Sequence, residues 1–490
     1  MPFDDIRNSR IEKLNRLRAT GVDPYPATTA RTHSIADALV QFESLSSDAH
    51  EIVLAGRIMA HRTHGGISFI DLDDGSGAIQ GLVGNDRLSE EPYQFFLSVV
   101  DVGDIIEITG ALTTTKRGER SIDAKKWRML TKSIRPLPEK WHGLQDVEER
   151  YRQRHVDILM NRSVHDALQT RFKLIAVIRK FFQSHDFLEV ETPTLQVIPG
   201  GASARPFETH MNDLDLNLFL RVAPELYLKR LLVGGFERIF EIGKCFRNEG
   251  MDRDHNPEFT MLEAYAAWKD REWLMSFTED LIVSITTEIF GSPEVVVNGR
   301  TIIFKKPFAR MTFAEAAERA SGIPYNSGTE EEYLVRAHAL GIVVEKATTK
   351  AVLADEIYKK ALREEIIDPI FIIDHPLELS PLSKRISPNS DTVARFQLIV
   401  GGFELCNAFS ELNDPIDQRG RFEAQENLRA KGNQEAQRID EDFLSALECG
   451  MPPAAGIGIG IDRLVAFLTS AKTLREILPF PTMKPTKTDA

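Results

Sequence analysis

The stretch FRNEGMDRDHNPEFTMLEAY, residues 246–265, is typical of a β-hairpin, and the rest of the chain is organised around it. Period-two alternation puts Arg247 and Glu249 on one face of its first strand. A charged loop over residues 250–254 turns the chain back. The returning strand presents four side chains to a common surface, namely Phe259, Met261, Glu263 and Tyr265.

The hairpin carries side chains suited to an anion and to a flat ring. The planar donors of Arg247 match a phosphate or a carboxylate, and an aromatic ring such as Phe259 matches an adenine. The alternative is a surface hairpin held by salt bridges. Two ionic residues, an aromatic ring and a further carboxylate on one face favour the binding site.

A glycine-rich strand, GIGIGIDRLVAFL at residues 456–468, leads into a helix. Its glycines allow the backbone to approach another element or a ligand closely. We expect Asp462 to cap a helix that begins at Arg463. A cation at a helix start is unfavourable unless an anion is bound there, so Arg463 is a candidate anion-binding residue. The run lacks the GxGxxG spacing of a dinucleotide fold.

The segment GGFELCNAFSELND, residues 401–414, predicts a further strand of the same site. Asn407, Phe409 and Glu411 alternate and therefore share one face. Strict alternation puts Glu404 on the opposite face. If Glu404 also serves the site, a bulge or a turn must intervene.

The segment FFQSHDFLEVETPTLQVIPGGASARPF, residues 181–207, predicts a helix end, a short strand, a proline stop and a glycine loop. Nothing in it suggests chemistry, so we interpret it as structural, at a subunit contact. Helical patterns cover residues 164–184 and 331–365. The chain after about residue 156 is therefore expected to be α+β, built around an antiparallel sheet.

The N-terminal part has a different pattern. Apolar residues at helical spacing predict an amphipathic helix over residues 4–17, which GVDPYP ends. Short β runs between residues 52 and 131, separated by glycine turns, predict a small barrel of the OB type. Within it Ile70 and Leu72 face inward, while Phe69 faces outward. An outward aromatic ring can stack a base, although a lone exposed Phe often has no role.

Domain boundaries follow from these changes of pattern. The proline-punctuated IRPLPEKWHG, residues 134–143, reads as a connection between two parts. We expect a helical extension at residues 1–50, the barrel at 51–135, a linker at 136–155 and the α+β domain at 156–490.

Composition sets further bounds. The 490 residues are 42% hydrophobic and 27% charged, and no apolar run approaches the roughly 18 residues of a membrane span. The polar N-terminus does not resemble a signal peptide, so a cytoplasmic location is expected. The cysteines Cys245, Cys406 and Cys449 are far apart and indicate neither zinc nor a disulfide framework.

Charge is unevenly distributed. The net charge of −13 argues against a nucleic-acid partner, yet residues 115–154 hold twelve Lys and Arg against six Asp and Glu. Such a patch can contact phosphates on an otherwise acidic protein. From charge alone, a solvated face or a linker is the favoured interpretation.

Together these stretches resemble the class II aminoacyl-tRNA synthetases and, within them, the bacterial-type lysyl enzymes. FLEVETP resembles motif 1, the dimer element; FRNEG with HNPEF resembles motif 2, and GIGIGIDR resembles motif 3. IPGGASARPF, APELYLKR and NAFSELNDP resemble the lysyl members. The resemblance covers nearly the whole chain. It implies an OB anticodon domain, an antiparallel class II catalytic domain flanked by helices, and a homodimer.

The resemblance implies substrates as well: ATP with Mg²⁺, lysine and tRNA(Lys). Arg247 and Arg463 would be the catalytic pair, holding the α- and γ-phosphates of ATP. The implied ATP site is Arg247, Glu249, His255, Phe259, Glu404, Gly460 and Arg463. The implied lysine site is Gly201, Glu225, Arg247, Glu263, Tyr265, Asn407, Phe409 and Glu411. The implied anticodon contacts are Phe69, Gln80 and Glu119, with the basic stretch as a tRNA backbone surface.

Two positions depart from the family pattern. The glycine usual in motif 1 is Asp186 here, which would alter a turn but no chemistry. Of two acidic magnesium positions, Glu404 matches one, but Gln397 occupies the other. An amide coordinates through its carbonyl without bringing charge, so one metal site is expected to be weaker or differently occupied.

Two rival functions follow from the same resemblance. An aspartyl or asparaginyl enzyme of the same group is disfavoured, because acids at Glu225, Glu263 and Glu411 suit a cationic substrate. A non-catalytic RNA-binding or regulatory descendant would be expected to lose Arg247, Glu249 or Arg463, and all three are present.

Overall fold

The computed structural model describes residues 3–47, 50–138, 144, 146–253, 255–344, 348–430 and 436–485. The chain forms two compact units, Met1–Gln145 and Asp146–Ala490. Residues 139–143 and 145 of the expected linker, together with Asp254 of the charged loop, lie outside the described residues. Within the described part, no helix is both long and apolar enough to cross a membrane.

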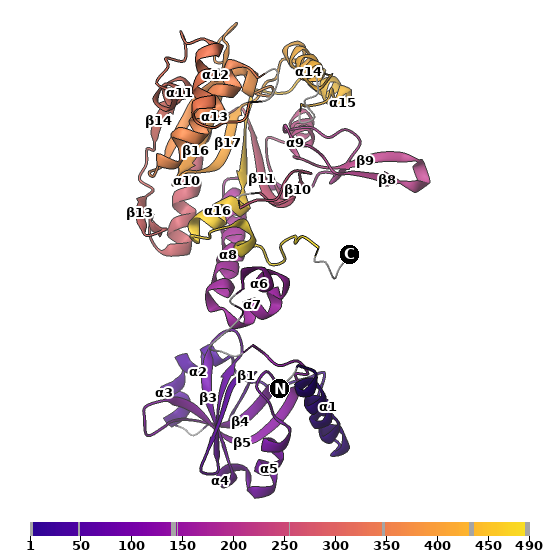
Figure 1. The fold of residues 1–490 in the computed structure, drawn as a ribbon, viewed down its shortest axis with the longest axis vertical. Helices are drawn as coiled ribbons and strands as arrows, with labels where there is room; N and C mark the ends of the chain where they lie inside the picture. The colour runs from indigo at the N-terminus through magenta and orange to yellow at the C-terminus, as the bar shows by residue number, and fades with distance from the viewer. Residues whose placement is uncertain are drawn as a thin grey trace. The chain divides into compact units, whose positions relative to one another are not determined.

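The first unit is a closed five-stranded barrel in the order β1-β2-β3-β5-β4 (Figure 1). Inward side chains such as Ile70 and Leu72 are fully buried, as the alternation predicted. Leu17 of the first helix belongs to the same hydrophobic core. The strands are β1 (Ile52–His64), β2 (Ile67–Asp73), β3 (Ala78–Gly84), β4 (Ile105–Thr114) and β5 (Arg120–Thr131).

Helices pack against the closed barrel. Helix α5 follows β3 and buries Tyr93, Phe96 and Val99 against the barrel core. The sequence pattern did not anticipate this helix. The helices of this unit are α1 (Phe3–Ala19), α2 (Ile35–Val40), α3 (Phe42–Ser47), α4 (Asn85–Leu88) and α5 (Glu90–Val99).

The second unit is built on an eight-stranded sheet that is antiparallel except at its two edges, where β14 pairs with β15 and β6 pairs with β10 in parallel. This confirms the α+β expectation. In order across the sheet the strands are β14 (Ala309–Thr312), β15 (Ile370–Pro376), β16 (Thr392–Val400), β17 (Phe403–Ser410), β18 (Ala454–Gly460), β11 (Glu258–Ala267), β10 (Arg238–Phe246) and β6 (Leu188–Glu189).

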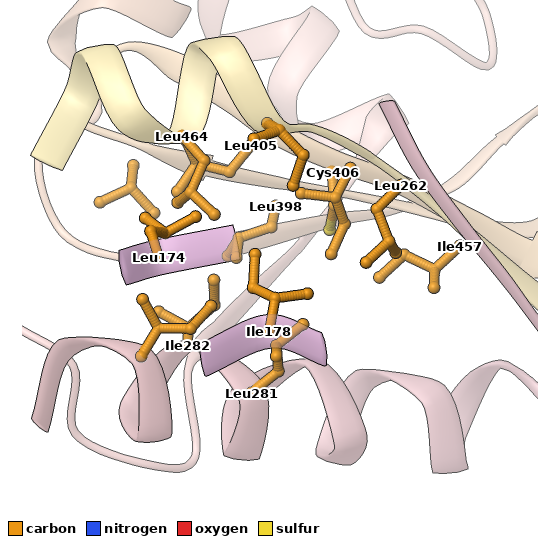
Figure 2. Packing of buried hydrophobic residues seen from close by; sticks show 14 of the residues in the cluster. Leu174, Ile178, Leu262, Leu281, Ile282, Leu398, Leu405, Cys406, Ile457 and Leu464 are labelled. Carbon is orange, nitrogen blue, oxygen red and sulfur yellow. The ribbon is translucent and has the colours of Figure 1, made fainter. Parts of the chain in front are cut away.

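One face of this sheet carries the main hydrophobic core. Helices α8 (Arg162–Ser184) and α10 (Arg271–Phe290) place Ile178 and Leu281 against Leu262 and Leu398 of the strands (Figure 2). Helix α16 (Ile461–Leu468) closes the same core through Leu464. Because strand residues alternate, the side chains beside Leu262 point to the opposite face, where the cavity lies.

Further helices and small strands complete the second unit (Figure 1). The other helices are α6 (Val147–Arg152), α7 (Arg154–Met160), α9 (Glu225–Val233), α11 (Phe313–Ser321), α12 (Glu330–Ala339), α13 (Lys350–Ala361), α14 (Pro415–Ala430) and α15 (Glu441–Glu448). The small strands are β7 (Leu195–Gln196), β8 (Glu208–Met211), β9 (Leu216–Leu220), β12 (Glu294–Val297) and β13 (Arg300–Ile303). Short 3-10 turns lie at Asn212–Leu214, Arg363–Glu365, Leu377–Leu379 and Leu474–Ile477.

Two local expectations are wrong. Strand β10 ends at Phe246, so Arg247 and Glu249 lie in the connection rather than on a strand face. Helix α16 begins at Ile461, and Asp462 does not cap it, because its carboxylate bonds to Arg171 and to the backbone of β11 instead.

One other local expectation is confirmed. In strand β17, Cys406 pairs with Leu398 but Glu404 pairs with Ile399, so Leu405 forms a bulge. The extra residue shifts Glu404 to the face that carries Asn407. Asp186, at the position where glycine is usual, adopts φ +63°, the left-handed conformation that favours glycine.

Candidate active site

A cavity of about 390 Å³ opens on the face of the sheet that lies opposite the main core. Its walls come from β11, β17 and β18, from the start of α9 and from the connection after β10. Most side chains that the sequence assigned to one site meet here. They are Gly201, Glu225, Arg247, Glu249, His255, Phe259, Glu263, Tyr265, Glu404, Asn407, Phe409, Gly460 and Arg463.

One end of the cavity is cationic. The guanidinium of Arg247 lies 5.1 Å from the centroid of the Phe259 ring, and its Nε has no hydrogen-bond partner among the described atoms. Arg463 donates from Nη2 to His255 Nε2 at 3.1 Å, and His255 Nδ1 contacts Asp252 at 2.9 Å. The two arginines are thus held, by different elements, facing a common space that suits a polyanion with an aromatic base.

Arg463 is positioned by a buried ion pair beneath it. Asp462 lies 2.6 Å from Arg171 of α8 and accepts from the backbone N–H of Thr260 at 3.1 Å. Arg171 also donates to the hydroxyl of Thr260 at 3.0 Å. This network joins α8, β11 and the first turn of α16, so the strand that carries Phe259 and the helix that carries Arg463 are held together.

The other end of the cavity is acidic. Glu263 is buried, and its carboxylate accepts a hydrogen bond from the Tyr265 hydroxyl at 3.0 Å. Burial, reinforced by the charge of Glu225, raises the pKa of Glu263 well above its ordinary value. Among the described residues no cation forms an ion pair with Glu263. A buried carboxylate in this state is a site for a cationic ligand.

Glu225 stands at the first residue of α9, against the glycine loop. Gly201 has φ +89°, and a side chain there would lie 2.9 Å from the Cβ of Glu225. Only glycine therefore allows this loop to lie so close to the carboxylate. Burial raises the pKa of Glu225, and the charge of Lys229 opposes part of that increase.

Glu411 does not line the cavity as the resemblance implied. It is buried one layer behind the wall, where one carboxylate oxygen lies against Gly456 and the Tyr265 ring. Its other oxygen lies 2.5 Å from Nζ of Lys229, which also pairs with Glu225 at 2.7 Å. Lys229 was not anticipated, because the sequence gives no local signal that a lysine on a helix is buried.

Arg395 is a second unanticipated residue of the wall. Its Nε donates to Oδ1 of Asn407 at 2.7 Å, and its Nη1 donates to the carbonyl of Leu379 at 2.8 Å. The bond orients the Asn407 amide with its oxygen toward Arg395 and leaves its N–H donors for the cavity. Asn407 is therefore prepared to meet an acceptor such as a carboxylate.

The two candidate metal positions differ in exposure. Glu404 lines the cavity, but Gln397 is buried and its amide oxygen accepts from His375 Nε2 at 3.2 Å. Burial, together with the charge of Arg395, lowers the pKa of His375 well below its usual value, so this pair is neutral. Among the described residues no group of three or more His, Cys, Asp or Glu side chains is arranged to hold a metal ion.

In the barrel, Phe69 and Gln80 lie on the neighbouring strands β2 and β3, and Glu119 lies in the turn before β5. Gln80 is opposite Asp71, two residues from Phe69, and Ser121 donates to Gln80 Oε1 at 3.3 Å. Ser121 also contacts the carbonyl of Glu119 at 3.2 Å, so Glu119 lies beside the same face. The half-exposed Phe69 ring is thus flanked by polar groups that can read a base edge.

The basic stretch is only partly available to a phosphate backbone. Lys132 is buried and pairs with Asp104 at 2.8 Å, and Arg154 is buried and pairs with Asp157 at 2.5 Å. These two buried cations therefore do not belong to the basic surface that the sequence predicted. Lys116, Arg117, Lys125 and Lys126 are exposed on the barrel.

Comparisons with known proteins agree with this geometry. Residues 146–484 match the family described as tRNA synthetases class II (D, K and N), and residues 52–130 match the OB-fold nucleic acid binding domain. The chain is 47% identical to a lysine–tRNA ligase of Roseiflexus sp., over 99% of this chain and 100% of the relative. It is 46% identical to that of Carboxydothermus hydrogenoformans, over 99% of both chains. For the lysine–tRNA ligase of Nostoc punctiforme the identity is 43%, over 99% and 89%.

Proposed function

The chain belongs to the class II tRNA synthetases of the aspartate, lysine and asparagine group, and on that premise we propose that it activates L-lysine with ATP and transfers it to tRNA(Lys). The observation that carries the choice of lysine is Glu263, a buried carboxylate at the closed end of the cavity without a cation partner among the described residues. A substrate ammonium supplies that partner.

ATP occupies the cationic end in this proposal. Phe259 stacks on the adenine, Arg247 binds the α-phosphate, and Arg463 binds the γ-phosphate with His255 beside it. Glu249 and Gly460 complete the nucleotide wall. The support is that Arg247 already lies against the Phe259 ring and that Arg463 points into the same space from the first turn of α16.

Lysine extends from this point toward the acidic end. Its carboxylate meets Arg247 and the N–H donors of Asn407, and its α-ammonium meets Glu225 beside Gly201. Its aliphatic chain passes Phe409, and its ε-ammonium reaches Glu263 and Tyr265, with Glu411 behind them. Donors thus face the carboxylate and acceptors face both ammonium groups, which is the complementarity that selects lysine.

The reaction needs positioning and charge neutralisation rather than a side-chain base. The lysine carboxylate attacks the α-phosphorus in line, forming a carboxyl–phosphate bond as the bond to pyrophosphate breaks. The terminal ribose hydroxyl of tRNA then attacks the acyl carbon and releases AMP. Arg247 stabilises charge that develops on the α-phosphate, and Arg463 holds the departing pyrophosphate.

Magnesium enters as part of the ATP substrate. Glu404 on the wall fits one Mg²⁺ held mainly by phosphate oxygens, because this ion accepts one protein carboxylate and keeps several waters. When bound, it offsets phosphate charge. Gln397 does not fit as a second ligand, since its oxygen accepts from His375.

The remaining assignments concern tRNA and assembly. Phe69, Gln80 and Glu119 read the anticodon, and exposed lysines of the barrel contact the backbone. The chain forms a homodimer through motif 1, supported by exposed apolar side chains at Leu188, Leu195 and Val197. We also propose a cytoplasmic location and a division into residues 1–50, 51–135, 136–155 and 156–490.

The two rival functions have less support. An aspartyl or asparaginyl substrate would place a carboxylate or an amide beside Glu263 and Glu225, where a carboxylate is repelled. A non-catalytic RNA-binding descendant would not need Arg247, Glu249 and Arg463 to meet in one cavity, as they do here.

Charging of tRNA(Lys) with labelled lysine tests the proposal. The full-length protein is expected to form lysyl-tRNA only with ATP and Mg²⁺, and Arg247→Ala should abolish it, because the guanidinium beside Phe259 that binds the α-phosphate is lost. Arg319→Ala, an exposed residue of α11, is the control and should charge normally. Normal charging by Arg247→Ala would remove Arg247 from the mechanism.

A further inference from the structure

Lys229 is an ammonium group of the chain itself, placed against the acidic end of the cavity. It is 0% exposed and lies one helical turn after Glu225 on α9. Its Nζ is 2.7 Å from Glu225, 2.5 Å from Glu411 and 5.4 Å from the centroid of the Phe409 ring. Every one of these partners is a residue of the proposed lysine site.

The charges at this end are unequal. Three buried carboxylates, Glu225, Glu263 and Glu411, face one buried ammonium, Lys229. Burial alone would lower the pKa of Lys229, but Glu225 and Glu411 more than offset it and the pKa is raised, so the group stays charged. Two carboxylates share this cation, whereas among the described residues the hydrogen-bond partner of Glu263 is the Tyr265 hydroxyl.

This arrangement gives Lys229 a function beyond folding. We propose that Lys229 is a positioning residue whose two ion pairs hold the side chains of Glu225 and Glu411 in place, and thereby leaves Glu263 as the carboxylate that must take the substrate's ε-ammonium. The inference rests on the proposed activation of lysine. Without Lys229 the three carboxylates would compete for protons, because like charges in a buried site cannot all stay ionised.

The position of Glu411 supports the same division of roles. Glu411 contacts Lys229 from behind the cavity wall, where it is 1% exposed, whereas Glu225 and Glu263 line the cavity. Lys229 does not line the cavity either, so it acts through the carboxylates rather than by touching the substrate. Its removal should therefore change lysine binding and leave the nucleotide end intact.

The test is lysine-dependent ATP–pyrophosphate exchange by the full-length enzyme, with KM measured separately for lysine and for ATP. Lys229→Met is expected to raise the KM for lysine roughly tenfold or more, the effect of at least one pKa unit of altered protonation. The KM for ATP should stay within about twofold, since Arg247 and Arg463 are untouched. A rise in both KM values, or in neither, would overturn the proposal.

A second variant separates positioning from a purely structural role. Lys229→Met alone leaves buried carboxylates unpaired and can destabilise the fold. Lys229→Met with Glu411→Gln removes one charge of each sign, so it is expected to restore the melting temperature, while the KM for lysine stays raised because Glu225 still lacks its cation. If the lysine KM returns to the wild-type value together with the melting temperature, Lys229 only stabilises the fold and the proposal fails.

A control variant and the wild-type enzyme together distinguish a failure of the Lys229 proposal from a failure of the proposed function. Lys244→Met removes a half-exposed lysine that pairs with Glu258 at 3.1 Å on the other face of the hairpin, and it should change neither KM. If the wild type shows no exchange with lysine, the proposed function itself fails. If the wild type is active and Lys229→Met keeps its lysine KM, only the role of Lys229 is wrong.

Discussion

Glu263 and Tyr265 show how single residues of this protein define the substrate. Both are fully buried side chains of β11, and burial raises the pKa of each well above its ordinary value. Neither raised pKa reflects a favourable interaction within the protein itself, because a buried carboxyl that is hard to ionise stabilises nothing on its own. The pair becomes favourable when an ammonium group enters, which ties its chemistry to the amino acid selected.

The pH dependence of lysine affinity follows from these carboxyls. Burial raises the pKa of Glu411 to about 8, and that of Glu263 is also raised. An entering ammonium favours the ionised form, so lysine binding should release protons, and affinity should weaken as the pH falls below about 8. Calorimetry in buffers of different ionisation enthalpy measures this release. Unchanged or tighter binding at lower pH contradicts it.

The free energy of unfolding of the ligand-free protein should fall as the pH rises, whereas lysine affinity should increase. A carboxyl whose pKa is higher in the folded than in the unfolded state binds more protons when folded. Its contribution therefore favours the folded state at low pH and is lost as the pH rises toward about 8. Lysine at saturating concentration should reduce this loss, because it restores a partner for the ionised form.

The magnesium requirement should depend on Glu404 and not on the position that the family usually fills with an acid. Glu404→Gln should raise the Mg²⁺ concentration needed for half-maximal exchange, because the carboxylate that faces the phosphates is gone. Gln397→Ala should leave that concentration nearly unchanged, since its oxygen already accepts from His375. A larger shift for Gln397→Ala than for Glu404→Gln would reverse these assignments.

Among the elements, strand β18 determines how closely the acidic end can pack. A side chain at Gly456 would overlap the Glu411 carboxylate and the Tyr265 ring, whereas one at Gly458 would meet its nearest neighbours at 3.9 Å. The two glycines lie on the same face of the same strand, but only Gly456 is in contact with the layer behind the cavity.

These glycines form a matched pair of substitutions. Gly456→Ala should lower the melting temperature of the ligand-free protein, because overpacking reduces the free energy of unfolding by an amount on the order of 1–3 kcal/mol. Gly458→Ala should leave it nearly unchanged, because its Cβ makes an ordinary contact. Differential scanning calorimetry without substrates compares them, and equal effects would show that Gly456 is not required for packing.

Elements also explain which parts of the site the sequence could predict. Strict alternation in β11 assigned Phe259, Met261, Glu263 and Tyr265 to one face, and all four line the cavity. Glu404 needed a bulge, which alternation could require but not locate. Arg247 lies beyond the end of β10, where the strand pairing with β11 stops, so a strand rule could not place it.

What the sequence missed depends on contacts between distant elements. Lys229 on α9 is buried because Glu411, at the end of β17, folds against it. Arg395 on β16 matters because it fixes the amide of Asn407 on β17. In the same way Asp462 has the residue type of a helix cap, yet it bonds to Arg171 of α8. None of these pairings leaves a local sequence pattern.

At the scale of the whole molecule, two units divide the proposed work. The unit Met1–Gln145 holds a closed barrel with its own core, and the unit Asp146–Ala490 holds the cavity with every residue of the proposed chemistry. In the proposed mechanism, adenylate formation uses residues of the second unit, whereas selection of tRNA also uses Phe69, Gln80 and Glu119 of the first.

This division predicts separable effects. Phe69→Ala should raise the KM for tRNA(Lys) in aminoacylation, by the roughly 1–3 kcal/mol that one base stack contributes, and should leave exchange without tRNA unchanged. Phe3→Ala removes another exposed aromatic ring of the same unit and serves as the control. An equal loss in both assays for Phe69→Ala would indicate misfolding rather than a lost base contact.

The most direct test of the central claim is ATP–pyrophosphate exchange by the purified full-length protein with each standard amino acid in turn, without tRNA. The arrangement of Glu225 and Glu263 around the closed end of the cavity predicts exchange with lysine and with no other amino acid. Exchange with aspartate or asparagine would contradict the assignment of that end to an ammonium group. Exchange with none, by a folded protein supplied with Mg²⁺, would contradict the catalytic function itself.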